Sequence, residues 1–296
     1  MLLAVHQQAP GSNPAVTAAW IAAGISLLTL LGSMGMQAFG IRRVSKDTNV
    51  VVREQLEQQR EQLDRTIAEE RSRTFNDRFA TAADRLGAGA AATRLAGVHA
   101  LAGLADDWRD GQQTCIDVLC AYLRLPYDAD PGSKKYGEDE REIRRTLIRV
   151  IRDHLRPGFS TVSWSRCKFS FEGAVFDCGD LSGIHLDAPG LMTFHGCRFV
   201  AEKFFLDHAV INGARMWFTR AVFAHGGFTF AGTQFSGSVS FDEAKFDGAD
   251  VTFAGSREEG PGLVTFNGVT HAAGQVDWGP FRERVPSGST AVTPVK

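Results

Sequence analysis

Charged side chains are absent from the first forty positions of this 296-residue chain, and strong net charge is absent from the whole. The formal net charge is only -2, so neither a basic nucleic-acid binder nor an acidic tail is favoured. Cysteines are few and odd in number, with no CxxC and none beside a histidine at zinc-finger spacing, which disfavours a disulfide framework or structural zinc. We therefore expect buried free thiols at Cys115, Cys120, Cys167, Cys178 and Cys197.

Catalytic signatures such as HExxH and GxSxG are also missing. Gly87 and Gly89 lie in LGAGAAATRLAG, but no strand precedes them and no GK[ST] follows, so this segment is predicted to be a turn between helices. His99 and His154 sit beside apolar helical positions and are predicted to be packing residues. No catalytic, cofactor-binding or metal-binding residue is assigned, and the chain is predicted not to be an enzyme.

The charge-free start contains an apolar run, Ala15–Phe39, that includes Trp20 and Leu31. At about 1.5 Å per helical residue such a run can cross a hydrocarbon core about 30 Å thick. A signal peptide is disfavoured because no Lys or Arg precedes the run. The sequence thus predicts a transmembrane helix over residues 15–40.

Basic residues follow this run directly, at Arg42, Arg43, Lys46 and Arg53. The positive-inside rule places them in the cytoplasm. We therefore expect a single-pass protein of the plasma (inner) membrane, with an extracytoplasmic tail at 1–14 and the bulk of the chain inside.

Residues 41–73 lack Gly and Pro and are rich in Glu, Gln and Arg, which predicts a helical stalk. Val52, Leu56 and Leu63 partly fit a coiled-coil core, whereas Gln59 and Thr66 occupy the intervening core positions. Both a parallel coiled coil and a solvated stalk remain open. A homodimer through the stalk, or through the small residues of the transmembrane helix, is compatible with these patterns.

Residues 74–157 predict a helical bundle, because apolar residues recur there at intervals of three and four. The expected helices cover about 75–86, 90–108, a third segment around Cys115–Leu123, and 139–155, with a polar loop at 127–138 before the last.

A five-residue period begins after Pro157 and extends over residues 158–279. Neither a helix nor an ordinary strand has this period. A chain that turns a corner every five residues can bury the large residue and the small one two before it, as in other solenoids. A β-sandwich would instead require strict alternation. The predicted inward residues are Phe171, Phe176, Leu181, Leu186, Leu191, Phe194, Phe199, Phe204, Leu206, Ile211, Met216, Phe218, Phe223, Phe228, Phe230, Phe235, Phe241, Phe246 and Val251.

The segments FEGAVFDCGDLSG, MTFHGCRF, MWFTRAVF, FTFAGTQF, VSFDEAKF and GADVTF resemble the A(D/N)LXX units of pentapeptide-repeat proteins, with Phe often replacing the central Leu. The resemblance implies a right-handed quadrilateral β-helix over roughly Thr161–Trp278. This sequence departs from the simplest pattern, because two-residue steps interrupt the fives and give a local twelve-residue period.

Together with RFATAADRLG, RLAGVHALAGLA, LCAYLRLPYD and VDWGPF, these units resemble bacterial membrane-anchored pentapeptide-repeat proteins. That group implies no particular biochemical activity. Residues 280–296 are expected to be a disordered tail, with Trp278 and Phe281 capping the last coil.

The leading functional prediction is a non-catalytic, membrane-tethered scaffold that presents the β-helix to an unknown protein partner. One alternative is a DNA-mimicking regulator of a topoisomerase, but residues 158–296 hold eleven Lys and Arg against fourteen Asp and Glu, well short of the charge density of DNA. The other alternative is a cryptic enzyme that clusters histidines with Asp187, Asp207 or Asp242. Its histidines would be His185, His195, His208, His225 and His271.

Overall fold

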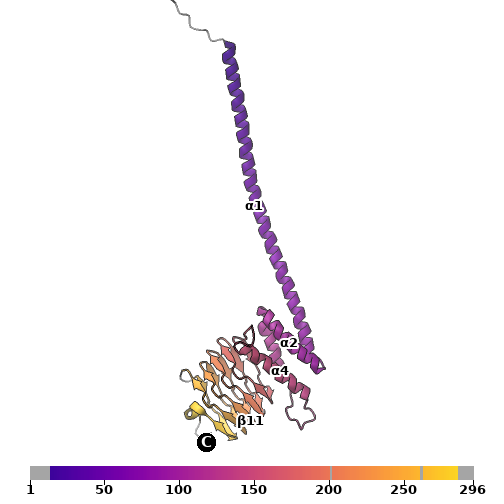
Figure 1. Ribbon diagram of the computed structural model, residues 1–296, viewed down its shortest axis with the longest axis vertical. Coiled ribbons are helices and arrows are strands. Elements are labelled where there is room, and N and C mark those ends of the chain that lie inside the picture. The colour runs from indigo at the N-terminus through magenta and orange to yellow at the C-terminus, as the bar shows by residue number, and fades with distance from the viewer. Residues whose placement is uncertain (1–13, 201, 261–262, 286–296) are drawn as a thin grey trace, which may run out of the picture. The chain divides into compact units, whose positions relative to one another are not determined.

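A computed structural model describes residues 14–200, 202–260 and 263–285 of the chain (Figure 1). The side chains of residues 14–22 and 33–51 lie outside what it describes. The chain divides into two compact units, Met1–Ser72 and Arg73–Lys296.

The first unit is formed by most of a single long helix, α1, which spans Pro14–Leu86. The helix predicted over residues 41–73 is thereby confirmed. Val52, Leu56 and Leu63 are exposed to 45%, 51% and 59% in the single chain. The coiled coil and the homodimer stay predictions.

No helix in the part of the chain that the structure describes is long and apolar enough to cross a membrane. The transmembrane helix predicted over residues 15–40 is therefore not supported. Of that range only residues 23–32 have described side chains, a window shorter than a membrane span requires.

The second unit begins with the end of α1 and three further helices, separated by turns and a loop. These are α2 (Ala91–Asp107), α3 (Gln112–Arg124) and α4 (Glu138–Leu155), with a 3₁₀ turn η1 (Arg109–Gly111) before α3. The predicted bounds of α2 and α4 are correct to within one residue. Their apolar faces meet in a shared core that contains Leu101, Leu119, Ile143 and Leu147.

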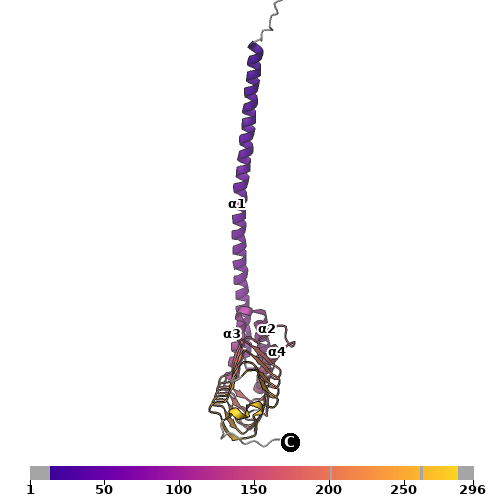
Figure 2. The same cartoon turned by 90° about the vertical axis from the view of Figure 1, so that its left-hand side faces the viewer.

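The rest of the second unit is a parallel β-solenoid, whose short strands stack as successive coils (Figures 1 and 2). Sheet A contains β1 (Lys168–Ser170), β5 (Leu191–Thr193), β9 (Arg215–Trp217), β13 (Ser238–Ser240) and β17 (Val264–Thr265). Sheet B contains β2 (Val175–Phe176), β6 (Arg198–Phe199), β10 (Val222–Phe223), β14 (Lys245–Asp247) and β18 (Thr270–Ala273). Sheet C contains β3 (Gly179–Asp180), β7 (Lys203–Phe205), β11 (Gly226–Thr229), β15 (Ala249–Thr252) and β19 (Val276–Asp277). Sheet D contains β4 (His185–Asp187), β8 (Val210–Asn212), β12 (Gln234–Phe235) and β16 (Arg257–Glu258).

Each coil takes 23 to 25 residues, as the strand register shows. Phe176 pairs with Phe199, Phe199 with Phe223, and Leu186 with Ile211. The twelve-residue period seen in the sequence is therefore about half a coil. Because residues two apart in a strand face the same side, each two-residue step gives one side of the coil two inward residues. Met216 and Phe218 do so on the side of sheet A.

The interior of the solenoid is a column of aromatic rings. Phe218 stacks on Phe194 and Phe241 with ring centroids 4.8 and 4.9 Å apart, and Phe223 stacks on Phe246 at 4.8 Å. Each buried Phe contributes about 1.5–3 kcal/mol through burial alone. The predicted inward column is confirmed, since its members are at most 3% exposed, with one exception.

Leu191 is that exception, because it is only half-buried while its neighbour Met192 is fully buried. The register explains the error. Met192 pairs with Phe169 on one side and Met216 on the other, so the step from Leu186 to the next strand's inward residue is six residues and not five.

The C-terminal end of the solenoid is closed by a 3₁₀ helix, η2 (Gly279–Arg284). Phe281 is buried there and its ring lies 5.7 Å from Phe253 and 5.5 Å from Phe266. Trp278 is buried as well, 1% exposed, so the predicted cap is confirmed. The expectation of disorder from residue 280 is wrong as far as Val285, because η2 packs on the core, and residues 286–296 lie outside the described residues.

Candidate functional site

The face of α4 opposite its apolar side carries a row of arginines. Arg141, Arg145, Arg149 and Arg152 follow one another at intervals of four, four and three residues, which puts them on one side of the helix. The spacing is present in the sequence, but a row of arginines at helical intervals is typical of any solvated helix face and does not by itself indicate a site.

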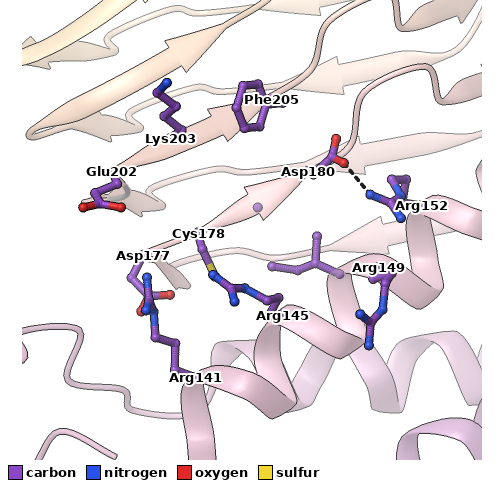
Figure 3. A pocket seen from close by; sticks show the side chains of 12 residues that line it. Arg141, Arg145, Arg149, Arg152, Asp177, Cys178, Asp180, Glu202, Lys203 and Phe205 are labelled. Carbon is purple, nitrogen blue, oxygen red and sulfur yellow. Dashed lines mark hydrogen bonds and ion pairs between the residues drawn. The ribbon is translucent and has the colours of Figure 1, made fainter. Parts of the chain in front are cut away.

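The arginine row lines a groove of about 710 Å³ between α4 and the first strands of sheet C (Figure 3). From the solenoid come Asp177, Cys178, Gly179, Asp180, Glu202, Lys203 and Phe205, while α4 supplies the four arginines and Ile148. The groove therefore brings together residues from α4, β3 and β7.

Ion pairs fix the two ends of this groove. At one end Arg141 Nε lies 3.0 Å from Asp177 Oδ2, which also accepts a hydrogen bond of 2.7 Å from the Tyr127 hydroxyl. At the other end Arg152 pairs with Asp180 (Figure 3). Burial raises the pKa of Asp180, but hydrogen bonds from Ser182 and the nearby arginines outweigh it and hold that pKa below its usual value.

Between these ends the cations have weak ion pairs or none among the described residues. Arg145 lies against the Cys178 sulfur and pairs with Glu142 at 3.8 Å, where both side chains are about half-exposed, 52% and 50%. Such an exposed pair contributes little, typically below about 1 kcal/mol. Arg149 donates to the Thr146 hydroxyl at 3.1 Å, and no ion pair of Lys203 is found among the residues that the structure describes.

The floor of the groove is apolar or neutral, formed by Ile148, Phe205 and Cys178. Burial and the adjacent Asp177 raise the pKa of the Cys178 thiol to about 11, so it is protonated at neutral pH. A protonated thiol is a poor nucleophile. Cys178 therefore contributes a neutral surface to this site.

A second cavity of about 870 Å³ continues the groove past the Arg141–Asp177 pair. It shares Arg141, Asp177 and Glu202 with the first cavity and runs along the loop after α3. The loop supplies Asp128 and Asp130. The continuous groove thus has a basic part beside α4 and an acidic part beside this loop.

The three aspartates of the enzyme hypothesis accept hydrogen bonds from other residues of the solenoid. Asp207 accepts from the backbone of Ala231 at 2.9 Å, and Asp242 from the backbone of Asn267 at 2.8 Å, each in the following coil. Asp187 accepts from the Asn212 amide at 3.0 Å. Within the described ranges no group of three or more His, Cys, Asp or Glu is arranged to hold a metal ion.

Of the two helical histidines, His154 is part of a packed network. Its Nε2 lies 3.1 Å from Asp106, which also accepts from the Trp164 indole at 2.9 Å, and its ring stacks on Trp164 at 3.9 Å. This network joins α2, α4 and the segment leading into the first coil, as predicted for a packing residue. The prediction for His99 is wrong, because that side chain is exposed.

The fold defines the class of protein: a parallel β-solenoid that follows a helical N-terminal region. Comparisons with protein-family models, curated proteins and solved structures found no match.

Proposed function

We propose that this chain is a non-catalytic scaffold whose β-solenoid, of the bacterial pentapeptide-repeat type, binds a protein partner at the groove beside α4. The observation that carries the proposal is a set of three cations on the two walls of a groove: Arg145, which has only a weak, exposed ion pair, and Arg149 and Lys203, for which no ion pair is found among the described residues. Weakly paired charge of one sign at a concave surface favours a partner of opposite charge and speeds its association.

Rigidity supports the same proposal. The groove wall belongs to a solenoid with an aromatic core, and its end residues are held by Asp177 and Asp180. A preformed surface binds with a smaller ordering cost than a flexible one. The topoisomerase alternative has less support, because the groove beside α4 carries a row of arginines and does not imitate DNA.

Site-specific photo-cross-linking tests the proposal. A photoreactive amino acid at Glu202, exposed at the groove, is expected to cross-link a discrete partner protein in cells. The matched control is Ser238, which is also exposed and lies on sheet A, and it is expected to give no such product because sheet A lies on the opposite side of the coil from sheet C. Equal products at both positions, or a product at Ser238 alone, would contradict the proposal.

We propose separately that residues 15–40 attach the chain to the inner membrane with the solenoid in the cytoplasm. The support comes from the sequence, where a charge-free apolar run is followed by Arg42, Arg43 and Lys46. In the described window Leu27, Leu28 and Leu31 are exposed to 63%, 72% and 60%.

The full chain is then expected to stay in the membrane pellet after alkaline carbonate extraction. The double variant Leu27→Asp/Leu28→Asp is expected to shift to the supernatant, because carboxylates at a helix centre each cost about 2.5–3.5 kcal/mol in a bilayer. Val52→Asp/Leu56→Asp, in the stalk, is the control that should remain in the pellet. Release of the unaltered chain by carbonate would reject membrane spanning.

A further inference from the structure

The basic part of the groove is defined by Arg145, Arg149 and Arg152 on α4 and by Lys203 on β7. Arg145 and Arg149 are one helical turn apart, a rise of about 6 Å along α4. Lys203 lies on the facing wall of the same cavity (Figure 3). The two arginines thus stand one turn apart on the side of α4 that lines the groove.

This spacing matches alternate residues of an extended peptide. In a β-strand, residues i and i+2 face the same side and are about 6.6 Å apart. A guanidinium group binds a carboxylate through two parallel hydrogen bonds, and the geometry is better satisfied by Arg than by Lys. Two acidic residues separated by one other residue would therefore reach Arg145 and Arg149 together.

We propose that the basic part of the groove binds an acidic segment of a protein partner in extended conformation, with two carboxylate side chains in the pattern acid-x-acid. One carboxylate pairs with Arg145 and the other with Arg149, while Lys203 adds positive charge to the wall formed by β7. The inference rests on the proposed function, since it names the chemistry of the partner that the groove takes.

The groups facing the site limit how far the acidic segment extends. Asp180 is occupied by Arg152, and Asp177 by Arg141. Glu202 lines both parts of the groove, and beyond Arg141 the wall carries Asp128 and Asp130 together with the basic or titratable side chains of Arg198 and His225. A run of acids longer than the basic part would meet these carboxylates, so the pattern is expected to end there in neutral or basic residues.

The same carboxylates disfavour a nucleic acid in this groove. A nucleic-acid strand carries a phosphate at every nucleotide and would place charge against Asp128, Asp130 and Glu202. A short acidic peptide can keep its charge within the basic part.

Fluorescence anisotropy with the full chain and labelled peptides tests the assignment. An eight-residue peptide whose only charged side chains are those of Glu-Thr-Glu is expected to bind at least about tenfold more tightly than its Gln-Thr-Gln counterpart, which corresponds to about 1.4 kcal/mol in binding free energy. Adjacent Glu-Glu should bind more weakly than Glu-Thr-Glu, because adjacent side chains of an extended peptide face opposite sides. Raising the salt from about 0.05 M to about 0.5 M should weaken binding, since the pairs are partly exposed.

The variant Arg145→Gln/Arg149→Gln should lose this discrimination. Both side chains are exposed, so the fold is expected to survive, and thermal melting by circular dichroism verifies it. Arg215→Gln, on the outer face of sheet A, is the matched control and should bind the peptide unchanged.

Equal affinities for the Glu and Gln peptides, or equal binding by the double variant, would overturn the acid-x-acid assignment. So would tight binding of a phosphopeptide or an oligonucleotide in place of the acidic peptide. A partner still cross-linked at Glu202 in that event would leave the proposed function standing, whereas loss of that cross-link would reject the function itself.

Discussion

Replacing Phe218 by alanine is expected to lower the free energy of unfolding of the solenoid unit by about 3–5 kcal/mol, the usual range for a buried Phe cut to Ala. The Phe218 side chain is fully buried. Its ring stacks on Phe194 and Phe241 in the coils on either side and meets Phe230 edge-on at 5.5 Å. Loss of this ring leaves a cavity bordered by the three other rings, because the rigid stacked coils can collapse into the cavity only in part.

Urea denaturation followed by circular dichroism and by tryptophan fluorescence measures this loss. The matched control is Phe159→Ala, since Phe159 is 66% exposed and contacts Arg156 by a cation–π interaction at 5.4 Å. An exposed cation–π contact contributes only about 0.5–1 kcal/mol, so the control should stay within that range. Similar losses for the two variants would mean that the aromatic column does not carry the stability of the solenoid.

The five-residue period predicted this column because burial of large side chains is the strongest constraint on a solenoid sequence. What the period could not supply was the shape of the coil. A two-residue step changes only a short stretch of sequence. In the structure, however, it lengthens one side of a coil so that this side holds two inward residues. Leu191 shows the limit, because continuing the fives from Leu186 predicts it inward, whereas cross-coil pairing selects Met192.

The groove could not be predicted from the sequence, for a related reason. Its walls come from α4 and from β3 and β7, which are separated along the chain and brought together only by packing of the helices on the first coils. The spacing of Arg145 and Arg149 is readable in the sequence, but solvated arginine faces are common on helices. Only the facing Lys203 and the occupied carboxylates Asp177 and Asp180 distinguish this row from an ordinary surface.

The helices before the solenoid are packed closely enough for one methyl group to matter. Gly97→Ala, in α2, is expected to destabilise the unit by at least about 1–3 kcal/mol, the usual cost of overpacking. A Cβ at Gly97 would lie 2.4 Å from the Leu86 backbone nitrogen and 2.8 Å from its Cα. Backbone atoms cannot move aside as a flexible side chain does, so α2 would have to shift away from the end of α1.

Gly103→Ala is the matched control, because it makes the same chemical change in the same helix with nothing within 4 Å of the added Cβ. Alanine is the better helix former, so this variant is expected to gain about 0.4–1 kcal/mol. The two substitutions should therefore move the urea midpoint in opposite directions. A midpoint raised by both would show that α2 does not pack against Leu86 as closely as the structure has it, and that the helical region is stabilised by propensity more than by its contact with α1.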